Sequence, residues 1–432
     1  MEKAADGQVF SRESQMRIKS ILLIVPLLFV LLLCGFDQYS WGYYPVSPMD
    51  NEPIWNVPDV DVPLYTLTLE DGKVVSDVDY VVNLDISGKE EIKILNFADL
   101  HLTEEVINEK PREYQAFLNE LDCLVSEAEP DLITLTGDQV PSGGYGALKT
   151  LGEKINSYGV PWAPVFGNHD CDHGGEASLV KQAEIYESFS DCLFKRGPEG
   201  LNRVLETGAD SIGNYVVNLV TIDGDDFTVV RSLIFMNTGS NEIYNASDYP
   251  GQRRYSDHNY ACLNRNQIEW FKQMTRSVQQ YGDNGYVPCG IIMHMASFGY
   301  VYASSAAIRV HADIYSGWNW IFRTKMISYW QSLGNFYWRV GYEDSYGVMH
   351  EDIMGSPYEE GLFFAMNESG CTDFIMVGHD HDNNFNIKYD GINFVYGMKT
   401  GPLSYGTAGR GGTVITISSD GKASFRNILK GY

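Results

Sequence analysis

Five short polar clusters, each directly after an apolar run, constrain the fold of this chain more than any other feature of its sequence. Apolar runs bounded by polar residues are typical of buried strands, and the carboxyl ends of neighbouring parallel strands meet at one edge of a sheet. The pattern therefore predicts that the clusters come together in one site. In chain order they are Asp99-Leu100-His101, Gly137-Asp138, Gly167-Asn168-His169-Asp170, His294 and Gly378-His379-Asp380-His381.

The segments around the clusters alternate between strand and helix patterns. Residues 114–128 carry apolar side chains three and four positions apart, the spacing of a helix with one buried face, and Pro111 suits its first turn. The alternation predicts a layered α/β fold. Strands are predicted over residues 92–97, 131–135, 160–166, 232–237, 290–293 and 373–377, further helices over 147–158 and 267–281, and three closing antiparallel strands over 392–396, 413–418 and 423–428.

Composition narrows the choice of partners. The chain has 432 residues, of which 44% are hydrophobic, enough for one large α/β domain or two ordinary ones. Its formal net charge of −26 argues against nucleic acid or an anionic membrane surface as the main partner. The same charge repels a phosphate ester at long range. Bound cations would reverse the field locally, so an acidic protein and an anionic substrate are compatible.

The N-terminal part of the chain is predicted to lie outside the folded domain. Residues 21–36 are almost wholly apolar; the basic residues Arg12, Arg17 and Lys19 precede them and acidic residues follow. This asymmetry predicts an uncleaved transmembrane signal-anchor, with residues 1–20 as a cytoplasmic tail and the rest of the chain on the extracytoplasmic side of the membrane. The alternative is a signal peptide that is removed, which would give a secreted protein.

The remaining chain divides into a short extension and a large domain. Residues 37–90 predict an extracytoplasmic stalk or a small β extension, with a hairpin over residues 65–84 that turns at Asp71-Gly72. The main domain is predicted over residues 91–432. Within it, residues 296–361 are rich in Trp and Tyr and break the strand–helix rhythm, which indicates an inserted subdomain or lid, with core packing as the alternative.

Seven cysteines are present, one of them in the apolar N-terminal segment. The other six form an even set that an oxidising compartment could pair, and Cys171 with Cys192 is the preferred pair because these two bracket a short loop. The alternative is that the six are buried apolar thiols, since none has the C-x-x-C spacing of a metal site.

The polar clusters contain the side-chain types that bind Zn, Mn and Fe. Asp99 and His101 point the same way if the strand stays extended, and the carboxylate of Asp138 is able to bridge two cations. Asn168 offers a neutral carbonyl oxygen. Two adjacent divalent or trivalent ions are therefore predicted, with Fe, Mn and Zn all open as their identity. The predicted ligands are Asp99, His101, Asp138, Asn168, His294, His379 and His381.

His169 is better interpreted as a catalytic general acid than as a ligand. It follows Asn168 directly, close enough to protonate a leaving oxygen, and imidazole titrates near neutral pH. Asp170 is predicted to hold the other ring nitrogen, as carboxylates beside such histidines commonly do. Lys399 and Arg410, in glycine-rich surroundings, are interpreted as ordinary solvated charges rather than as phosphate contacts.

The ordered set of clusters resembles the calcineurin-like metallophosphoesterase superfamily, whose blocks read D-x-H, G-D, G-N-H-D/E, H and G-H-x-H. The stretch from Gly378 to Asn384, with a second glycine-containing stretch from Tyr396 to Gly401 behind it, is similar to a purple-acid-phosphatase-like branch. The resemblance covers the chain from residue 92 to the C-terminus. It implies a four-layer α/β/β/α sandwich of two mixed sheets.

The resemblance also implies a role for each matching residue. Asp99, His101, Asp138 and His381 would hold one ion, Asp138, Asn168, His294 and His379 would hold the other, and His169 would assist the leaving group. One position departs from the pattern. True purple acid phosphatases have a Tyr ligand three residues after the bridging Asp, whereas this chain has Pro141 there, so the resemblance does not extend to the coloured Fe(III)–tyrosinate site.

Residues and resemblance together predict a membrane-tethered, dinuclear metal-dependent phosphohydrolase with phosphate esters as substrates. A metal-bridging hydroxide would attack phosphorus while His169 protonates the leaving alkoxide. Two alternatives are a non-catalytic metal-binding scaffold of the same fold and a lipid phosphodiesterase whose segment 296–361 meets a membrane. Retention of His169 argues against the scaffold, because a structural metal site needs no general acid. Monoesters and diesters are both open as substrates.

Overall fold

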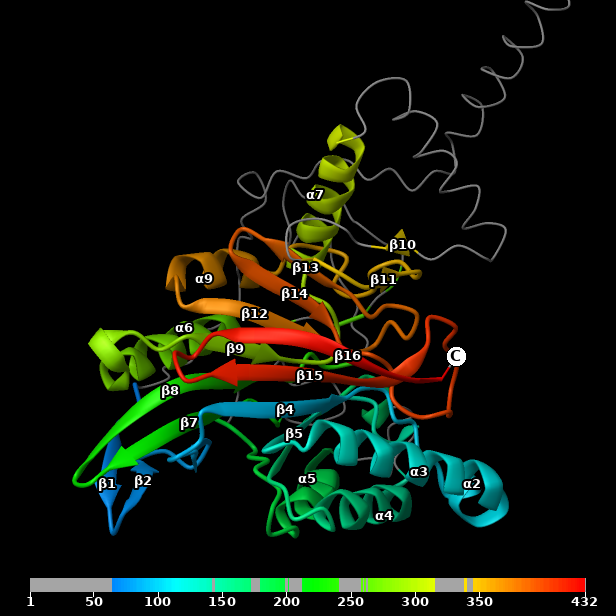
Figure 1. The fold of residues 1–432 in the computed structure, drawn as a ribbon, viewed down its shortest axis with the longest axis horizontal. Coiled ribbons are helices and arrows are strands. Elements are labelled where there is room, and N and C mark those ends of the chain that lie inside the picture. The colour runs from blue at the N-terminus through cyan, green and yellow to red at the C-terminus, as the bar shows by residue number, and fades with distance from the viewer. Residues whose placement is uncertain are drawn as a thin grey trace, which may run out of the picture. The chain divides into compact units, whose positions relative to one another are not determined.

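Two mixed β-sheets, one of seven strands and one of five, carry the polar clusters (Figure 1). The computed structural model describes residues 64–141, 144–171, 179–198, 201, 212–240, 258, 260–261, 263–314, 338–339 and 345–431. All the elements named below belong to one compact unit, formed by Pro45–His311 and Tyr337–Tyr432, apart from the last residues of one helix.

The five-stranded sheet has the strand order β16-β15-β4-β5-β6. Strands β4, β5 and β6 run parallel, and β15 runs antiparallel to both of its neighbours. Strand β5 (Leu132–Thr136) is buried at every position, as expected for a strand covered on both faces. The other strands are β4 (Glu91–Phe97), β6 (Trp162–Val165), β15 (Arg410–Ser418) and β16 (Ala423–Gly431).

The seven-stranded sheet has the strand order β13-β14-β12-β9-β8-β7-β3. Strands β14, β12, β9 and β8 run parallel, β13 and β7 are antiparallel to β14 and β8, and β3 runs parallel to β7. The closing strands at 413–418 and 423–428 are antiparallel as predicted, and the one at 392–396 pairs antiparallel with β13 but parallel with β12. The bounds are β3 (Val81–Asp85), β7 (Tyr215–Asp223), β8 (Asp226–Phe235), β9 (Cys289–Ile292), β12 (Thr372–Val377), β13 (Asn386–Tyr389) and β14 (Ile392–Tyr396).

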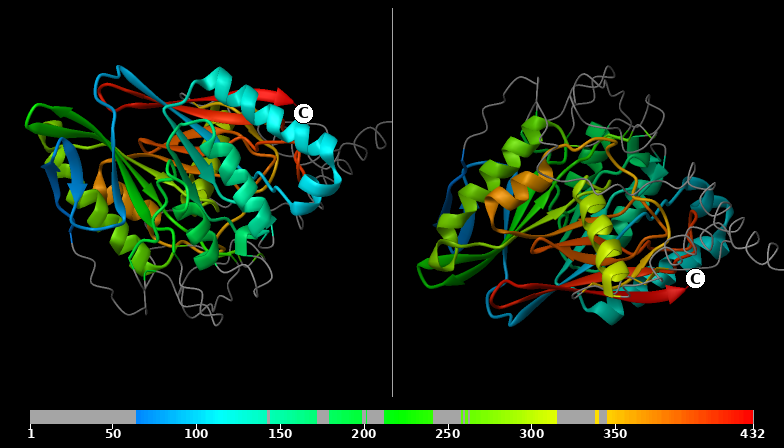
Figure 2. Two further views of the ribbon diagram at one scale, coloured as in Figure 1. Left: turned by 90° about the horizontal axis from the view of Figure 1, so that it is seen from below. Right: turned by 90° about the horizontal axis from the view of Figure 1, so that it is seen from above.

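Helices cover the outer faces of both sheets (Figure 2). Helix α3 (Pro111–Ala128) packs on β4 and β15, α6 (Arg265–Val278) on β8, and α9 (Leu362–Ser369) on β12. Between the sheets, the rings of Phe374 on β12 and Phe425 on β16 lie 5.3 Å apart. The predicted α/β fold with two mixed sheets is therefore confirmed. Further helices are α2 (Glu104–Glu109), α4 (Tyr145–Asn156) and α5 (Leu179–Glu187).

The N-terminal extension is partly built into the fold. A hairpin of β1 (Leu67–Glu70) and β2 (Lys73–Ser76) turns at Asp71-Gly72, whose φ values of 48° and 72° suit the right-handed twist of a hairpin. The predicted turn is confirmed, but the hairpin ends at Ser76. The next strand, β3, is instead an edge strand of the seven-stranded sheet, so the domain boundary expected at residue 90 is too late.

The aromatic-rich segment begins inside the core. The second residue of helix α7 (Gly299–Ile314) is Tyr300, which is fully buried and donates its hydroxyl to the carbonyls of Ile375 and Val395 at 2.8 Å each. Two short strands, β10 (Trp338–Arg339) and β11 (Val348–Met349), pair further on. Most of residues 315–344 lie outside the described residues, so the predicted lid stays a prediction.

The predicted signal-anchor at residues 21–36 also lies outside the described residues. None of the helices in the described part of the chain is long and apolar enough to span a bilayer.

The preferred disulfide between Cys171 and Cys192 is not formed in the structure. Cys192 is a free thiol, as are Cys123, Cys289 and Cys371 among the described side chains. Cys192 lies beside strand β6, where its backbone forms an isolated parallel β-bridge with Trp162. Burial raises the pKa of its thiol.

Candidate metal centre

The five clusters meet where strands of the two sheets end. Strands β4, β5 and β6 of one sheet lead into the first three clusters, and β9 and β12 of the other lead into the last two. Backbone bonds tie these ends together: Gly378 N–H donates to the His294 carbonyl at 3.0 Å, and His379 N–H donates to both carboxylate oxygens of Asp99 at 3.1 Å. The structure thus brings all seven predicted ligands into one region.

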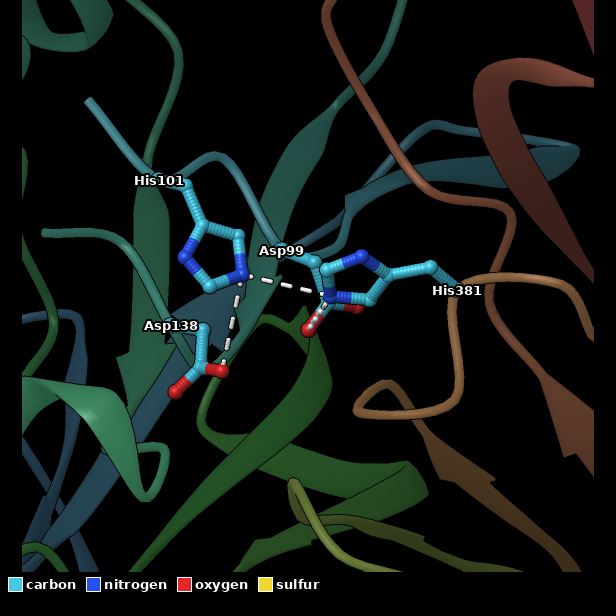
Figure 3. Close-up of side chains that lie close together, drawn as sticks. All are labelled: Asp99, His101, Asp138 and His381. Carbon is cyan, nitrogen blue, oxygen red and sulfur yellow. Dashed lines mark hydrogen bonds and ion pairs between the residues drawn. The ribbon is translucent and has the colours of Figure 1, made fainter. Parts of the chain in front are cut away.

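Four of these side chains point toward one another (Figure 3). They are Asp99, His101, Asp138 and His381, and their ligand atoms all lie within 4.8 Å of one another. His101 Nε2 lies 3.2 Å from His381 Nε2 and 3.6 Å from Asp138 Oδ2, and His381 Nε2 lies 3.3 Å from Asp99 Oδ1. Two imidazoles and two carboxylates at this spacing are suited to hold one ion.

A second group lies beside the first and shares Asp138. The ligand atoms of Asp138, His294 and His379 also lie within 4.8 Å of one another. His294 Nε2 lies 3.3 Å from Asp138 Oδ2 and 2.9 Å from Asn168 Oδ1. The carboxylate of Asp138 therefore faces both groups, which is the position required of a ligand that bridges two ions.

The hydrogen-bond partners of the histidines fit bound cations. His294 Nδ1 lies 2.7 Å from the Thr136 carbonyl oxygen, so Nδ1 carries a proton, and Nε2 would present a lone pair to an ion once it has lost its own proton. This lone pair faces Asn168 Oδ1, another acceptor, and the contact is favourable only with a cation or a proton between them. His381 has the same arrangement, because its Nδ1 lies 3.0 Å from the Tyr405 carbonyl. Backbone carbonyls commonly orient metal-binding histidines in this way.

The electrostatics of the site also favour cations. Burial disfavours the charged form of His294, but the carboxylates of Asp138 and Asp99 outweigh it and raise its pKa to about 10. Burial lowers the pKa of His101 to about 4 and that of His379 to about 3, so both rings are neutral near pH 7. The two buried carboxylates therefore create a negative potential, which divalent ions would neutralise.

Gly137 and Gly167 must be glycines because ligand residues lie too close to them for a Cβ atom. A Cβ on Gly167 would lie 2.2 Å from Asp138 Oδ1, and one on Gly137 would lie 2.3 Å from His294 Nδ1. Gly137 also has a φ of 89°, which an L-residue rarely adopts. The glycines therefore allow neighbouring loops to come close enough for their ligands to share one site.

Asp170 has a different role from the one predicted. Its buried carboxylate accepts backbone N–H bonds from Gly167 at 2.7 Å, Asp138 at 2.9 Å and Val140 at 3.1 Å. Both of its oxygens are directed at the backbone of two loops. This geometry corrects the prediction that Asp170 holds the ring of His169, and it makes Asp170 a positioning residue that joins the second and third clusters.

His169 lies at the edge of the ligand set. Its backbone N–H donates to Asp138 Oδ1 at 2.8 Å, and its ring meets the His101 ring edge-on with 5.4 Å between centroids. The residue is partly exposed. An imidazole that borders both the ligands and solvent is placed to pass a proton to a bound ester and to recover one from water.

Two tyrosines at the site were missed by the sequence analysis. The Tyr405 ring stacks on the His381 imidazole with 4.1 Å between centroids, and its hydroxyl donates to Glu351 Oε1 at 2.8 Å. Tyr260 meets the His379 ring edge-on at 4.5 Å. No motif marks either tyrosine, because both contacts depend on loops that approach the ligands only in the folded chain.

Lys399 and Arg410 are not the solvated charges that the sequence predicted. Lys399 is 3% exposed, its Nζ donates to two loop carbonyls, one of them that of Gly401 at 2.8 Å, and burial lowers its pKa to about 8. Arg410 pairs with Glu120 at 2.9 Å, and the other Glu120 oxygen accepts the Gly401 N–H at 3.0 Å. These residues hold the loop that carries Tyr405.

The fold and the paired ligand groups are those of a known class of proteins. Residues 92–315 match the calcineurin-like phosphoesterase family, and the chain belongs to that family. The family resemblance stated from the clusters is therefore confirmed. The chain is therefore a member of a class of phosphoesterases. The two ligand groups are suited to divalent metal ions.

Individual relatives are distant. The chain is 24% identical to the Arabidopsis thaliana protein named "Probable inactive purple acid phosphatase 28", over 73% of this chain and 71% of the relative. It is 33% identical to a "Probable cyclic nucleotide phosphodiesterase" from Moraxella catarrhalis, over only 24% of this chain and 36% of that protein. Among solved structures, a dimetal phosphatase from Danio rerio aligns with a TM-score of 0.39 and 11% identity, over 75% of this chain and 92% of the other.

Proposed function

We propose that this protein is a dinuclear metal-dependent phosphohydrolase that cleaves phosphate esters. The observation that carries the proposal is the carboxylate of Asp138, which faces two ligand groups at once. When bound, a pair of ions supplies a nucleophile at neutral pH and neutralises the oxygens of the phosphoryl group. Asp99, His101, Asp138 and His381 would hold one ion, and Asp138, Asn168, His294 and His379 would hold the other.

The surrounding residues have separate tasks in this proposal. Asp138 fixes His169 relative to the ligands, because its Oδ1 accepts the His169 backbone N–H. The His169 ring donates a proton to the leaving oxygen of the ester. Asp170 keeps the second and third clusters in place, and Tyr405 holds the ring of His381 through its carbonyl and its stacked ring.

Pro141 limits the choice of metal chemistry. It follows Asp138 by three residues, where a purple acid phosphatase has its tyrosine ligand, and a prolyl side chain has no donor atom. We therefore expect no tyrosinate absorption band from the metal-loaded protein. Fe, Mn and Zn remain open, and metal analysis of the purified protein distinguishes them.

A non-catalytic scaffold is the second candidate. The names of the Arabidopsis relatives, which call them probable inactive phosphatases, favour it. Against it, this chain has six Asp and His side chains in two groups, Asn168 beside them, and a histidine, His169, at their edge. A purely structural ion needs the ligands but not that histidine.

His169→Ala tests the proposal. The full chain, loaded with Zn, Mn or Fe in turn, is assayed on nitrophenyl phosphate, bis-nitrophenyl phosphate and an alkyl phosphate. We expect kcat to fall by about 10²–10⁴-fold, with the largest loss on the alkyl ester, because a poor leaving group depends most on protonation. Bound metal, measured by mass spectrometry, should match the wild type.

His350→Ala is the matched control for the loss of an imidazole. His350 lies 3.8 Å from Asp382 and outside both ligand groups, so turnover should stay at the wild-type level. Full turnover of the alkyl ester by His169→Ala would exclude the general-acid role. A loaded wild type with no activity on any of the esters would favour the scaffold instead.

We also propose that residues 21–36 anchor the protein in a membrane, with residues 1–20 in the cytoplasm and the phosphoesterase domain outside. The support is the long apolar run behind basic residues. Alkaline carbonate extraction should leave the protein in the membrane fraction, and protease added outside the membrane should digest the domain. A mature N-terminus beyond residue 36 would show a secreted protein instead.

A further inference from the structure

Two buried cysteines lie in contact at the end of the seven-stranded sheet that is remote from the metal centre. Cys289 is the first residue of β9, and Cys371 directly precedes β12, the neighbouring strand. Their Sγ atoms lie 3.6 Å apart. The Cys289 backbone N–H also donates to the Cys371 carbonyl at 2.8 Å, so paired backbone holds the two residues side by side.

We propose that Cys289 and Cys371 form a structural disulfide that cross-links β9 to β12. Each thiol gives up its proton, the two sulfur atoms together lose a pair of electrons, and one S–S bond forms. A low-molecular-weight disulfide, such as glutathione disulfide, takes up the electrons and the protons and becomes two thiols. The exchange needs no other reactant.

The surroundings of the pair suit this chemistry. The contact with the Cys289 thiol is the main cause that lowers the pKa of Cys371 to about 7, and the thiolate is the form that attacks a disulfide. Cys289 is fully buried and Cys371 is 3% exposed. The bond therefore forms as β9 and β12 pair during folding, and once formed it is shielded from external thiols.

The cross-link has a structural consequence for the site. It closes a connection of 82 residues, which includes α7 and the whole aromatic-rich segment 296–361. It also joins the starts of the two strands whose far ends present His294 and His379. Closing so long a connection restricts the unfolded chain, so the disulfide stabilises this strand pair without contact with the ligands.

Peptide mapping of the whole chain tests the proposal. The protein is folded in a glutathione redox buffer, treated with N-ethylmaleimide in denaturant, digested without reduction and analysed by mass spectrometry. We expect a linked peptide pair that contains Cys289 and Cys371 and that separates on reduction. Cys123, an exposed thiol on α3, should carry the maleimide in the same sample.

Thermal unfolding with and without reductant gives a second readout. Reductant should lower the Tm of the wild type and of the control Cys123→Ser, and should leave the Tm of Cys289→Ser and Cys371→Ser unchanged. Recovery of both Cys289 and Cys371 as maleimide adducts would overturn the proposal, as would a link from either to another cysteine. The mapping uses the wild type, so the test stands even if a variant fails to fold.

Discussion

The two ends of the seven-stranded sheet hold buried charge in opposite ways. At the end remote from the metal centre, fully buried Arg231 on β8 donates to both carboxylate oxygens of Asp373 on β12, at 2.7 and 2.6 Å. At the other end, the carboxylates of Asp99 and Asp138 face histidines. The first arrangement neutralises its charge within the protein, and the second is suited to a cation from outside.

Backbone conformation separates the same two ends. Four ligand residues have left-handed φ values: Asp99 at 56°, His101 at 48°, Asp138 at 53° and His379 at 76°. Each costs roughly 1–2 kcal/mol relative to a right-handed conformation. Neither Arg231 nor Asp373 has a positive φ. Strain that is concentrated at a set of convergent side chains indicates that the loops were selected to place ligands, and not for stability.

Asp138→Asn should have the largest effect, because it removes the one carboxylate that faces both ligand groups. We expect metal affinity, measured by titration with a competing chelator, to fall by more than about 100-fold, and turnover to be lost. The folded structure should persist without metal, since the substitution removes a buried charge.

Asp373→Asn is the matched substitution at the remote end. It leaves Arg231 buried without a full counter-charge, so the free energy of unfolding should fall by roughly 2 kcal/mol, while metal content and kcat of the folded protein stay as in the wild type. Denaturant unfolding and metal analysis of Asp138→Asn and Asp373→Asn measure these two effects. If Asp138→Asn lost stability but kept its metal, the contrast between the two ends would be wrong.

Gly167→Ala tests how tightly the ligand end is packed. The new Cβ would lie 2.2 Å from Asp138 Oδ1, so the bridging carboxylate must move, and metal affinity should fall by about 10–100-fold. Gly144→Ala is the control, because its Cβ would lie 3.4 Å from the nearest atom, an ordinary contact. Equal metal affinity in Gly167→Ala and Gly144→Ala would show that the loop around Gly167 moves to accommodate a Cβ atom.

Glu359→Gln should give the smallest effect, and one that depends on pH. Burial raises the pKa of Glu359 from 4.5 to about 7, so between these values the folded protein holds a proton that the unfolded chain releases. The stability from this group is present below pH 4.5 and is lost as the pH rises toward 7.

The glutamine variant should therefore match the wild type in acid and exceed its free energy of unfolding by on the order of 1 kcal/mol near neutral pH. Denaturant unfolding over this pH range measures the difference. Asp373→Asn, whose effect comes from the lost pair with Arg231, should show no such rise with pH. If the free energies of unfolding of wild type and Glu359→Gln changed with pH in the same way, the raised pKa of Glu359 would be wrong.

Much of the fold was predictable because local patterns were strong. Pro111 and the three-and-four spacing of Phe117, Leu121 and Leu124 specified α3, and all three side chains are buried. The strands before the clusters were found for the same reason, since each is a short apolar run that ends in polar residues. Edge strand β3 was assigned to the hairpin over residues 65–84, because its mixed burial pattern does not indicate a sheet strand, and only its pairing with β7 makes it part of the sheet.

The ligands of the site were predictable from the sequence, but the residues that hold those ligands in position were not. Asp170 follows His169 in the sequence, which suggested a contact between them. Its carboxylate instead accepts N–H groups from Gly167 in its own loop and from Asp138 and Val140 in the loop after β5. Tyr405 reaches His381 only because Lys399 and Glu120 hold its loop. Such contacts have no local pattern, since each depends on segments that the fold brings together.

The sequence by itself determined the family, the α/β layering and the identity of the ligands, because strand-end clusters of Asp, His and Asn are a local chemical pattern that survives in the linear chain. The tertiary structure decided the rest. It placed Asp138 between two ligand groups, turned Asp170 away from the predicted role, and brought Cys289 against Cys371 in place of the pair chosen from spacing. Those outcomes depend on distances between strands, which are set by the register of the two sheets. No single segment of the sequence specifies that register.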